Sequence, residues 1–145
     1  MPTNEQNRLA GGCQGGYAPP PMTATHTHPV SAPLTAGDAP PELSVVVTLY
    51  NESGSLGELH RRTLAVLDGL GRPFEIVYVD DGSRDASLTI ANALPARGAD
   101  VQVVSLSRNF GKELALTAGL DLVDTDAALV LDADGQDPPE LIPAF

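Results

Sequence analysis

The sequence predicts an α/β fold built around a parallel β-sheet, extending over residues 43–145 of the 145-residue chain. Four short, mostly apolar runs, the first of them rich in β-branched residues, alternate with expected helices, the first of which has leucines at helical spacing. This alternation is typical of βαβ units, in which successive strands run parallel and the crossovers are right-handed. Residues 1–42 lack both patterns. They hold 8 prolines and 5 glycines and little that is apolar, so we expect a disordered leader there.

The first expected unit is a strand followed by a long helix. Leu43–Leu49 (LSVVVTL) is a β-branched run suited to a buried strand. Leucines recur at helical spacing from residue 56 to residue 70, and Ser53 or Ser55 can cap this helix at its start. Two glycines and a proline then end the helix by residue 73.

The same order of elements repeats along the rest of the chain. The expected elements are a strand over 74–79 (FEIVYV), a helix capped by Asp85 and ending near residue 94, a strand over 101–106 (VQVVSL), a helix over about 112–123, and a strand over 127–131 (AALVL). Pro138 or Pro139 suits the first turn of a last helix, because proline is tolerated there.

Charge and composition exclude several classes of function. The chain carries 8 basic and 19 acidic residues, a net charge of −11, and its one lysine is Lys112. Nucleic-acid binding needs clustered Lys and Arg, so we expect no nucleic-acid partner. The single cysteine, Cys13, excludes an intrachain disulfide. We find neither an apolar run of roughly 18 residues that could span a membrane nor a secretory signal, and therefore expect a cytoplasmic location.

Polar residues follow every expected strand, at the edge where an open parallel sheet binds its ligand. They are Tyr50-Asn51-Glu52, Asp80-Asp81, Arg108-Asn109 and Asp132-x-Asp134. Neither a P-loop nor a G-x-G-x-x-G turn is present to hold a phosphate. Asp132 and Asp134 supply another way: their spacing points both side chains in one direction, and hard carboxylate oxygens can hold Mg²⁺ or Mn²⁺ that bridges to a diphosphate.

Four ordered motifs resemble those of the family 2 glycosyltransferases. They are residues 45–52 (VVVTLYNE), 79–85 (VDDGSRD), 108–112 (RNFGK) and 132–140 (DADGQDPPE). The last two look most like the polyprenyl-phosphate branch, which includes dolichyl-phosphate mannosyltransferases and bactoprenol glucosyltransferases. The resemblance covers residues 43–145, and implies a Rossmann-like GT-A domain that binds a nucleotide-sugar donor and transfers the sugar, with inversion, to a polyprenyl phosphate.

The resemblance also implies roles for individual residues. Donor-binding positions are matched by Thr48, Tyr50, Glu52, Asp80, Asp81, Arg108, Lys112 and Ala133. Asp80 and Asp81 correspond to the residues that hold the base and the ribose. Asp132 and Asp134 correspond to the Asp-x-Asp motif for Mg²⁺ or Mn²⁺, and Gln136 to a further metal contact. Thr48 departs from the pattern, since many relatives carry proline there, and we expect a small effect on the pocket.

The second departure is the ending at Phe145, just after the acidic motif. We expect the acceptor-binding half, the catalytic residues and any membrane helices to lie beyond Phe145. The full-length form is then expected at the cytoplasmic face of a membrane. The unfinished sheet edge is prone to association, so homo-oligomerisation stays open as an expectation.

Other interpretations remain open from the sequence. The first is a nucleotide-sugar-binding fragment without turnover. The second is a haloacid dehalogenase-like phosphohydrolase, because LVLDADG resembles that motif, with Asp132 as nucleophile and Asp134 as acid. The third is a signalling module of receiver type with an acidic metal pocket. Asp80 and Asp81 can also be ordinary turn and capping residues, since Asp-Gly-Ser is common in turns.

Overall fold

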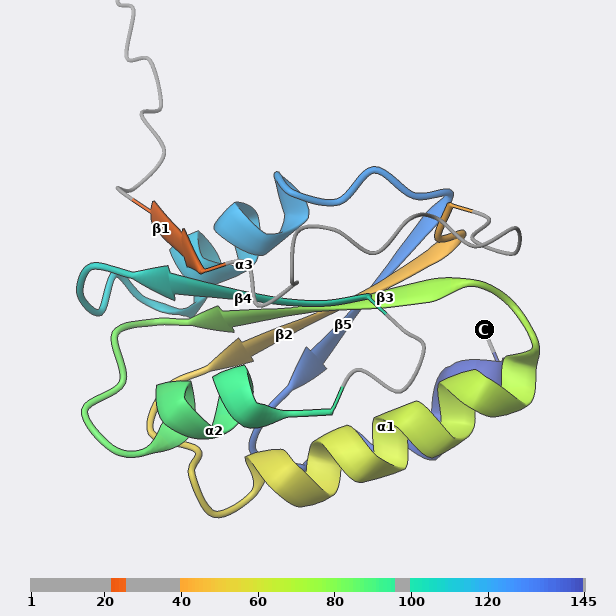
Figure 1. The fold of residues 1–145 in the computed structure, drawn as a ribbon, viewed down its shortest axis with the longest axis horizontal. Coiled ribbons are helices and arrows are strands. Elements are labelled where there is room, and N and C mark those ends of the chain that lie inside the picture. Colours follow the sequence, from red (N-terminus) through yellow and green to blue (C-terminus); the bar gives the residue numbers. More distant parts are fainter. Residues whose placement is uncertain (1–21, 26–39, 96–99, 145) are drawn as a thin grey trace, which may run out of the picture.

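The computed structural model describes residues 22–25, 40–95 and 100–144, and it confirms the predicted α/β fold (Figure 1). Its sheet has five strands in the order β1-β4-β3-β2-β5. The parallel strands are β2 (Leu43–Leu49), β3 (Phe74–Asp80), β4 (Asp100–Leu106) and β5 (Ala127–Asp132). The helices are α1 (Leu56–Leu70), α2 (Ser87–Ala93) and α3 (Lys112–Leu120), followed by the 3-10 helix η1 (Pro139–Ala144).

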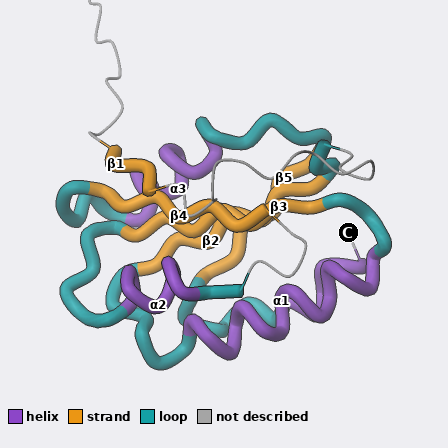
Figure 2. The backbone as a smooth tube through the Cα atoms, in the orientation of Figure 1, coloured by secondary structure: helices purple, strands orange, loops and turns teal. Residues whose placement is uncertain are grey.

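The helices cover both faces of the sheet, as Figure 2 shows, with α1 and α2 on one side and α3 on the other. Alternate strand residues supply the two cores. Val45, Val47 and Tyr78 face the core that Leu56 and Leu67 of α1 complete. The residues between them in each strand, among them Val46 of β2 and Val79 of β3, face the opposite side of the sheet. There they form the second core with Ala115 and Ala118 of α3. Burial on both faces explains why β2 and β3 read as continuous apolar runs.

Helix α3 is held in position because it packs very close to the sheet at Gly119. A Cβ added to Gly119 would lie 2.5 Å from Cγ1 of Val46 and 2.9 Å from Cγ2 of Val79. Only glycine therefore lets α3 sit this near β2 and β3. The first residue of α3 is Lys112, so this packing also sets where the lysine side chain begins.

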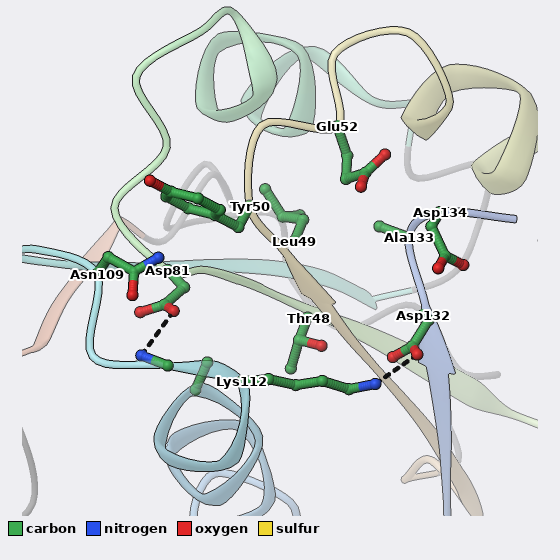
Figure 3. A pocket seen from close by; sticks show the side chains of 12 residues that line it. Thr48, Leu49, Tyr50, Glu52, Asp81, Asn109, Lys112, Asp132, Ala133 and Asp134 are labelled. Atoms are coloured by element: carbon green, nitrogen blue, oxygen red, sulfur yellow. Dashed lines mark hydrogen bonds and ion pairs between the residues drawn. The ribbon is translucent and has the colours of Figure 1, made fainter.

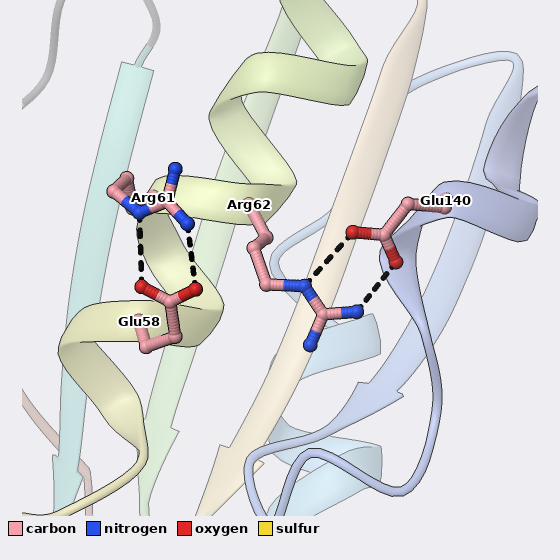
Figure 4. A network of polar contacts seen from close by, with 4 residues as sticks. All are labelled: Glu58, Arg61, Arg62 and Glu140. Atoms are coloured by element: carbon pink, nitrogen blue, oxygen red, sulfur yellow. Dashed lines mark hydrogen bonds and ion pairs between the residues drawn. The ribbon is translucent and has the colours of Figure 1, made fainter.

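Two helices differ from the sequence-based expectation. Helix α3 ends at Leu120 rather than near residue 123, because Leu122 and Val123 donate their N–H groups three residues back, which tightens the chain into turns. The segment expected as a last helix forms the 3-10 helix η1, which contains Pro143 and so lacks one N–H donor. It is joined to α1 by Arg62, which donates to both oxygens of Glu140 at 2.8 and 2.6 Å (Figure 4).

The expected disordered leader needs a correction at Met22–Thr25. These four residues form strand β1, which pairs antiparallel with β4. Pairing of this kind uses main-chain N–H and C=O groups along a free sheet edge, so it requires no apolar pattern in the added strand. Of the rest of the expected leader, residues 40–42 are described and lead into β2, whereas residues 1–21 and 26–39 lie outside the described part of the chain.

Among residues 22–25, 40–95 and 100–144, the longest helix is α1 with 15 residues, and none is long and apolar enough to cross a membrane.

Candidate functional site

Eight of the eleven predicted site residues meet at the carboxyl ends of the parallel strands, where they line a pocket of about 260 Å³ (Figure 3). The predicted residues in its lining are Thr48, Tyr50, Glu52, Asp81, Lys112, Asp132, Ala133 and Asp134. Register explains part of this gathering, because Thr48 of β2 pairs directly with Asp132 of β5. We call this cavity the strand-end pocket.

Three predicted residues lie elsewhere. Asp80 and Arg108 line a second pocket of about 340 Å³, together with Arg84 and Ser105. Asp80 and Asp81 are consecutive, so their side chains leave the end of β3 on opposite sides and serve different cavities. Gln136 is exposed and lines neither pocket, and its main-chain N–H donates to Oδ1 of Asp134 at 2.9 Å.

Asp81 holds the loop that leads into α3. Its two carboxylate oxygens accept hydrogen bonds from the main-chain N–H groups of Phe110 and Gly111, at 2.7 and 2.9 Å. N–H groups at a helix start have no partner within the helix, so a carboxylate placed there stabilises it. Asp81 thus acts as a capping residue, although the N-cap position that it binds, Gly111 before α3, lies 30 residues later in the chain rather than in the adjoining turn.

Asp80 is almost fully buried, at 1 % exposure, and has one oxygen without a partner. Oδ2 accepts from the N–H of Ser83 at 3.2 Å, and the Ser105 hydroxyl lies at 3.5 Å. Within the described residues, Oδ1 accepts no hydrogen bond. A buried, unsatisfied acceptor in a pocket wall fits a ligand that brings a donor, such as a ring N–H or a hydroxyl.

Lys112 and Asp132 form an ion pair across the floor of the strand-end pocket, with Nζ 2.5 Å from Oδ2 (Figure 3). The hydrogen bond to Asp132 raises the pKa of Lys112, and the charges of Asp132, Asp134 and Asp137 add to this effect. The side chains are 61 % and 29 % exposed, so both remain within reach of a ligand.

The acidic motif offers part of a metal site. Asp132 ends β5, Asp134 follows two residues later, and both line the strand-end pocket. No group of three or more His, Cys, Asp or Glu side chains in the described ranges is arranged to hold a metal ion. Two carboxylates do fit the way Mg²⁺ is commonly held, by one or two carboxylates together with substrate phosphates. The residues therefore fit a metal ion whose remaining ligands come from a diphosphate.

The loop after β2 is fastened to the loop after β3. The N–H groups of Asn51, Glu52 and Ser53 donate to Ser83 Oγ, Ser87 Oγ and Asp85 Oδ2, at 3.0, 2.7 and 3.1 Å. In return, the N–H of Arg84 donates to Oδ1 of Asn51 at 2.9 Å. Asn51 adopts a left-handed conformation, with φ of 57°, which asparagine tolerates better than most residues. This cross-linking positions Tyr50 and Glu52 over the strand-end pocket.

Some lining residues were not among the candidates drawn from the sequence. Leu49, Gly111 and Ala115 also line the strand-end pocket, as does Asn109, which the sequence placed at the strand ends without a donor-binding role. Asn109 and Gly111 belong to the RNFGK motif that supplied two candidates, so inclusion of the whole motif would have found them. Leu49 and Ala115 are core residues whose edges reach the cavity, and no sequence signal marks them.

Comparison with known proteins decides the family. The model of the family described as "Glycosyl transferase family 2" matches residues 44–145. The chain belongs to glycosyltransferase family 2. This membership confirms the resemblance seen in the four motifs, and it overturns the phosphohydrolase and receiver-module alternatives.

Curated members of family 2 show the same similarity. An undecaprenyl-phosphate 4-deoxy-4-formamido-L-arabinose transferase of Pseudomonas paraeruginosa is 51 % identical over 102 residues, which cover 70 % of this chain and 30 % of the relative. An uncharacterized glycosyltransferase of Synechocystis is 46 % identical over 101 residues, covering 70 % of this chain and 32 % of the relative. The chain thus spans about a third of the length of these relatives.

Solved structures agree with the GT-A expectation for family 2. A mannosyltransferase from Pyrobaculum calidifontis, solved with GDP-Man and Mn²⁺, matches with a TM-score of 0.55 at 25 % identity, over 72 % of this chain and 30 % of that chain. TarS of S. aureus matches with a TM-score of 0.55 at 31 % identity, over 64 % of this chain and 16 % of that chain.

Proposed function

We propose that this chain supplies the donor-binding part of an enzyme that transfers a sugar from a nucleotide sugar to a polyprenyl phosphate, with Mg²⁺ or Mn²⁺. The observation that carries the proposal is the composition of the strand-end pocket, in which Asp132 and Asp134 line the same cavity as Tyr50 and Glu52. Support for the lipid acceptor comes from the relatives named undecaprenyl-phosphate transferases. Support for a nucleotide-sugar donor and Mn²⁺ comes from the structural neighbour bound to both.

The two pockets divide the donor between them in this proposal. Asp80, with its unpartnered Oδ1, takes a donor group of the base or ribose in the second pocket. Asp132 and Asp134 hold the metal ion at the diphosphate in the strand-end pocket. Thr48, Tyr50, Glu52, Asp81 and Ala133 line the strand-end pocket around the diphosphate, where Lys112 supplies positive charge, and Arg108 supplies positive charge in the second pocket.

Charge explains why a metal is needed. Among its described lining residues, the strand-end pocket holds four carboxylates, from Glu52, Asp81, Asp132 and Asp134, against the single ammonium of Lys112. A diphosphate entering such a pocket is repelled. A divalent cation neutralises this repulsion and, when bound, stabilises the negative charge that develops on the leaving diphosphate.

The transfer step we propose is a single displacement. A phosphate monoester has a second pKa of about 6, so a polyprenyl phosphate is mostly dianionic at neutral pH. Its oxygen therefore needs little help from a general base. Its oxygen attacks the anomeric carbon while the bond from that carbon to the diphosphate oxygen breaks, which inverts the configuration. The nucleoside diphosphate leaves with the electron pair. A polyprenyl-phosphate acceptor lies in a membrane, so transfer to it takes place at a membrane surface.

Titration calorimetry tests donor binding. The 145-residue chain is titrated with UDP-sugars and GDP-sugars, with and without Mn²⁺. We expect heat that depends on the metal for one of the two nucleotides. A folded sample that binds neither nucleotide in the presence of Mn²⁺ contradicts the proposal. A sample that binds donor but transfers no sugar to polyprenyl phosphate favours the second candidate, a donor-binding fragment without turnover.

A further inference from the structure

The ion pair between Lys112 and Asp132 places a cation where the proposed metal site needs a free carboxylate. Nζ of Lys112 lies 2.5 Å from Oδ2 of Asp132, and Asp132 is one of only two carboxylates that the acidic motif directs into the strand-end pocket. One carboxylate is thus already neutralised by a group of the chain itself.

We propose that Lys112 is an internal counter-ion that withholds Asp132 from divalent cations until a diphosphate enters the pocket, and that the ammonium then transfers to the diphosphate. The inference rests on the proposed function in one respect, the use of Asp132 by a divalent cation. It adds a coupling: metal and diphosphate bind together, and neither binds well alone.

Charge supports the coupling. A divalent cation that approaches Asp132 alone must compete with the ammonium for one carboxylate and is repelled by it. A diphosphate supplies new negative charge that both cations can share. The same lysine therefore opposes the metal ion without the diphosphate and favours the pair when both are present.

The fold lets this exchange occur in a side chain alone. The main chain before Lys112 is held by the Phe110 and Gly111 N–H groups on Asp81. The far part of α3 is held by the contact of Gly119 with Val46. The long lysine stem carries its ammonium on rotatable bonds and is 61 % exposed, so it can turn from Asp132 toward a ligand without movement of α3.

The test compares Lys112→Met with Arg61→Met in the 145-residue chain. Each variant removes one positive charge, but Arg61 pairs with Glu58 on α1 and lines no part of the strand-end pocket (Figure 4). Binding of Mn²⁺ is measured by electron paramagnetic resonance of the free ion, first alone and then with inorganic pyrophosphate as a probe for the diphosphate.

We expect Lys112→Met to have opposite effects in the two arms. Without pyrophosphate, it binds Mn²⁺ at least about threefold more tightly than the unchanged chain, a factor within the range of a partly exposed ion pair. With pyrophosphate, it binds the Mn²⁺–pyrophosphate pair at least about threefold more weakly, because the ammonium is missing. Arg61→Met changes neither affinity by as much as twofold. A gain of Mn²⁺ affinity cannot arise from loss of folding.

Each other result overturns the proposal in a recognisable way. Equal Mn²⁺ affinity in the unchanged chain and Lys112→Met means that the lysine does not withhold Asp132, although the metal site of the proposed function stands. Weaker Mn²⁺ binding by Lys112→Met both with and without pyrophosphate means that Lys112 supports the metal site and does not compete with the metal ion. No Mn²⁺ binding by any of the three proteins, even with pyrophosphate, contradicts the metal site itself and with it the proposed function.

Discussion

Gly82 faces the main chain of Arg108 so closely that a Cβ on Gly82 would lie 2.5 Å from the Arg108 carbonyl carbon. Gly82 also has a φ of 68°, a left-handed conformation that side chains disfavour. The turn after β3 and the loop after β4 therefore meet backbone to backbone. Their contact forms the wall of the second pocket, which both residues line.

Replacement of Gly82 by alanine is expected to damage this wall. The matched control is Gly135→Ala, since Gly135 has a φ of 78° but no atom within 4 Å of its Cβ position. Gly135→Ala pays only the left-handed strain, about 1–2 kcal/mol. Gly82→Ala adds a clash with main-chain atoms and should lower the free energy of unfolding by about 3 kcal/mol or more. Urea unfolding measures the free energy of unfolding of both variants. Equal losses in the two would show that the main chain of Arg108 moves aside without further cost.

Removal of the Asp81 carboxylate should loosen the start of α3. Asp81→Ala leaves the N–H groups of Phe110 and Gly111 without their acceptor, at a cost of about 1–3 kcal/mol for an unsatisfied buried donor. Asp126→Ala, at an exposed carboxylate, should change the free energy of unfolding by less than about 0.5 kcal/mol. Hydrogen exchange of the two amides locates the effect. Unchanged exchange at Phe110 and Gly111 in Asp81→Ala would contradict the capping role.

Loss of charge at Asp134 should weaken donor binding only when metal is present. Asp134→Asn keeps the shape of the side chain and removes a hard anionic ligand, and we expect at least about tenfold weaker binding, or about 1.4 kcal/mol. Asp137→Asn removes a neighbouring exposed charge outside the strand-end pocket and serves as the control. Calorimetry with and without Mn²⁺ separates the cases, because an equal loss in both would indicate a folding role.

The attachment of η1 to α1 should weaken in acid. The hydrogen bonds from Arg62 lower the pKa of Glu140 to about 2, from an ordinary value of 4.5. A carboxyl whose pKa is lowered on folding stabilises the fold above its unfolded pKa, and this contribution is lost as the pH falls through the folded pKa. The contribution of this ion pair is therefore complete above about pH 4.5 and lost toward pH 2.

Carboxyl resonances of Glu140, followed by NMR against pH, check this prediction. In Arg62→Gln the midpoint should rise toward 4.5, because the largest cause of the shift is gone. Arg61→Gln should leave the midpoint near that of the unchanged chain, since Arg61 acts on Glu140 only through the weakest of the causes. A midpoint near 4.5 in the unchanged chain would mean that the ion pair does not form in solution.

The fold was predictable because its signals are local. The β-branched run of β2 and the leucine spacing of α1 each identify one element without knowledge of the rest. Once the strands are known to be parallel, their carboxyl ends must share one edge of the sheet. The sequence therefore predicts that Asp132 and Tyr50 lie close together. Strand β1 escaped prediction because it is held by main-chain pairing with β4, and the side-chain pattern of Met22–Thr25 carries no mark of that.

Details of the site were not predictable because they depend on register and on side-chain direction. Lys112 reaches Asp132 across 20 residues of sequence, a pairing that requires both the position of α3 and the pairing of β5 with β2. The division of Asp80 and Asp81 between two pockets follows from strand alternation, but which cavity lies on which side depends on the loops.

The hydrogen bonds between the loop at residues 51–53 and the turn at residues 83–87 restrict how this scaffold can be re-engineered. One loop carries Glu52 to the strand-end pocket, and the other begins where Asp80 enters the second pocket. Replacement of either loop alone would leave hydrogen-bond donors and acceptors of the other loop without partners. If the proposed function holds, donor preference is best altered by exchange of both loops together, with Asn51 and Ser87 kept because they carry the hydrogen bonds between the loops.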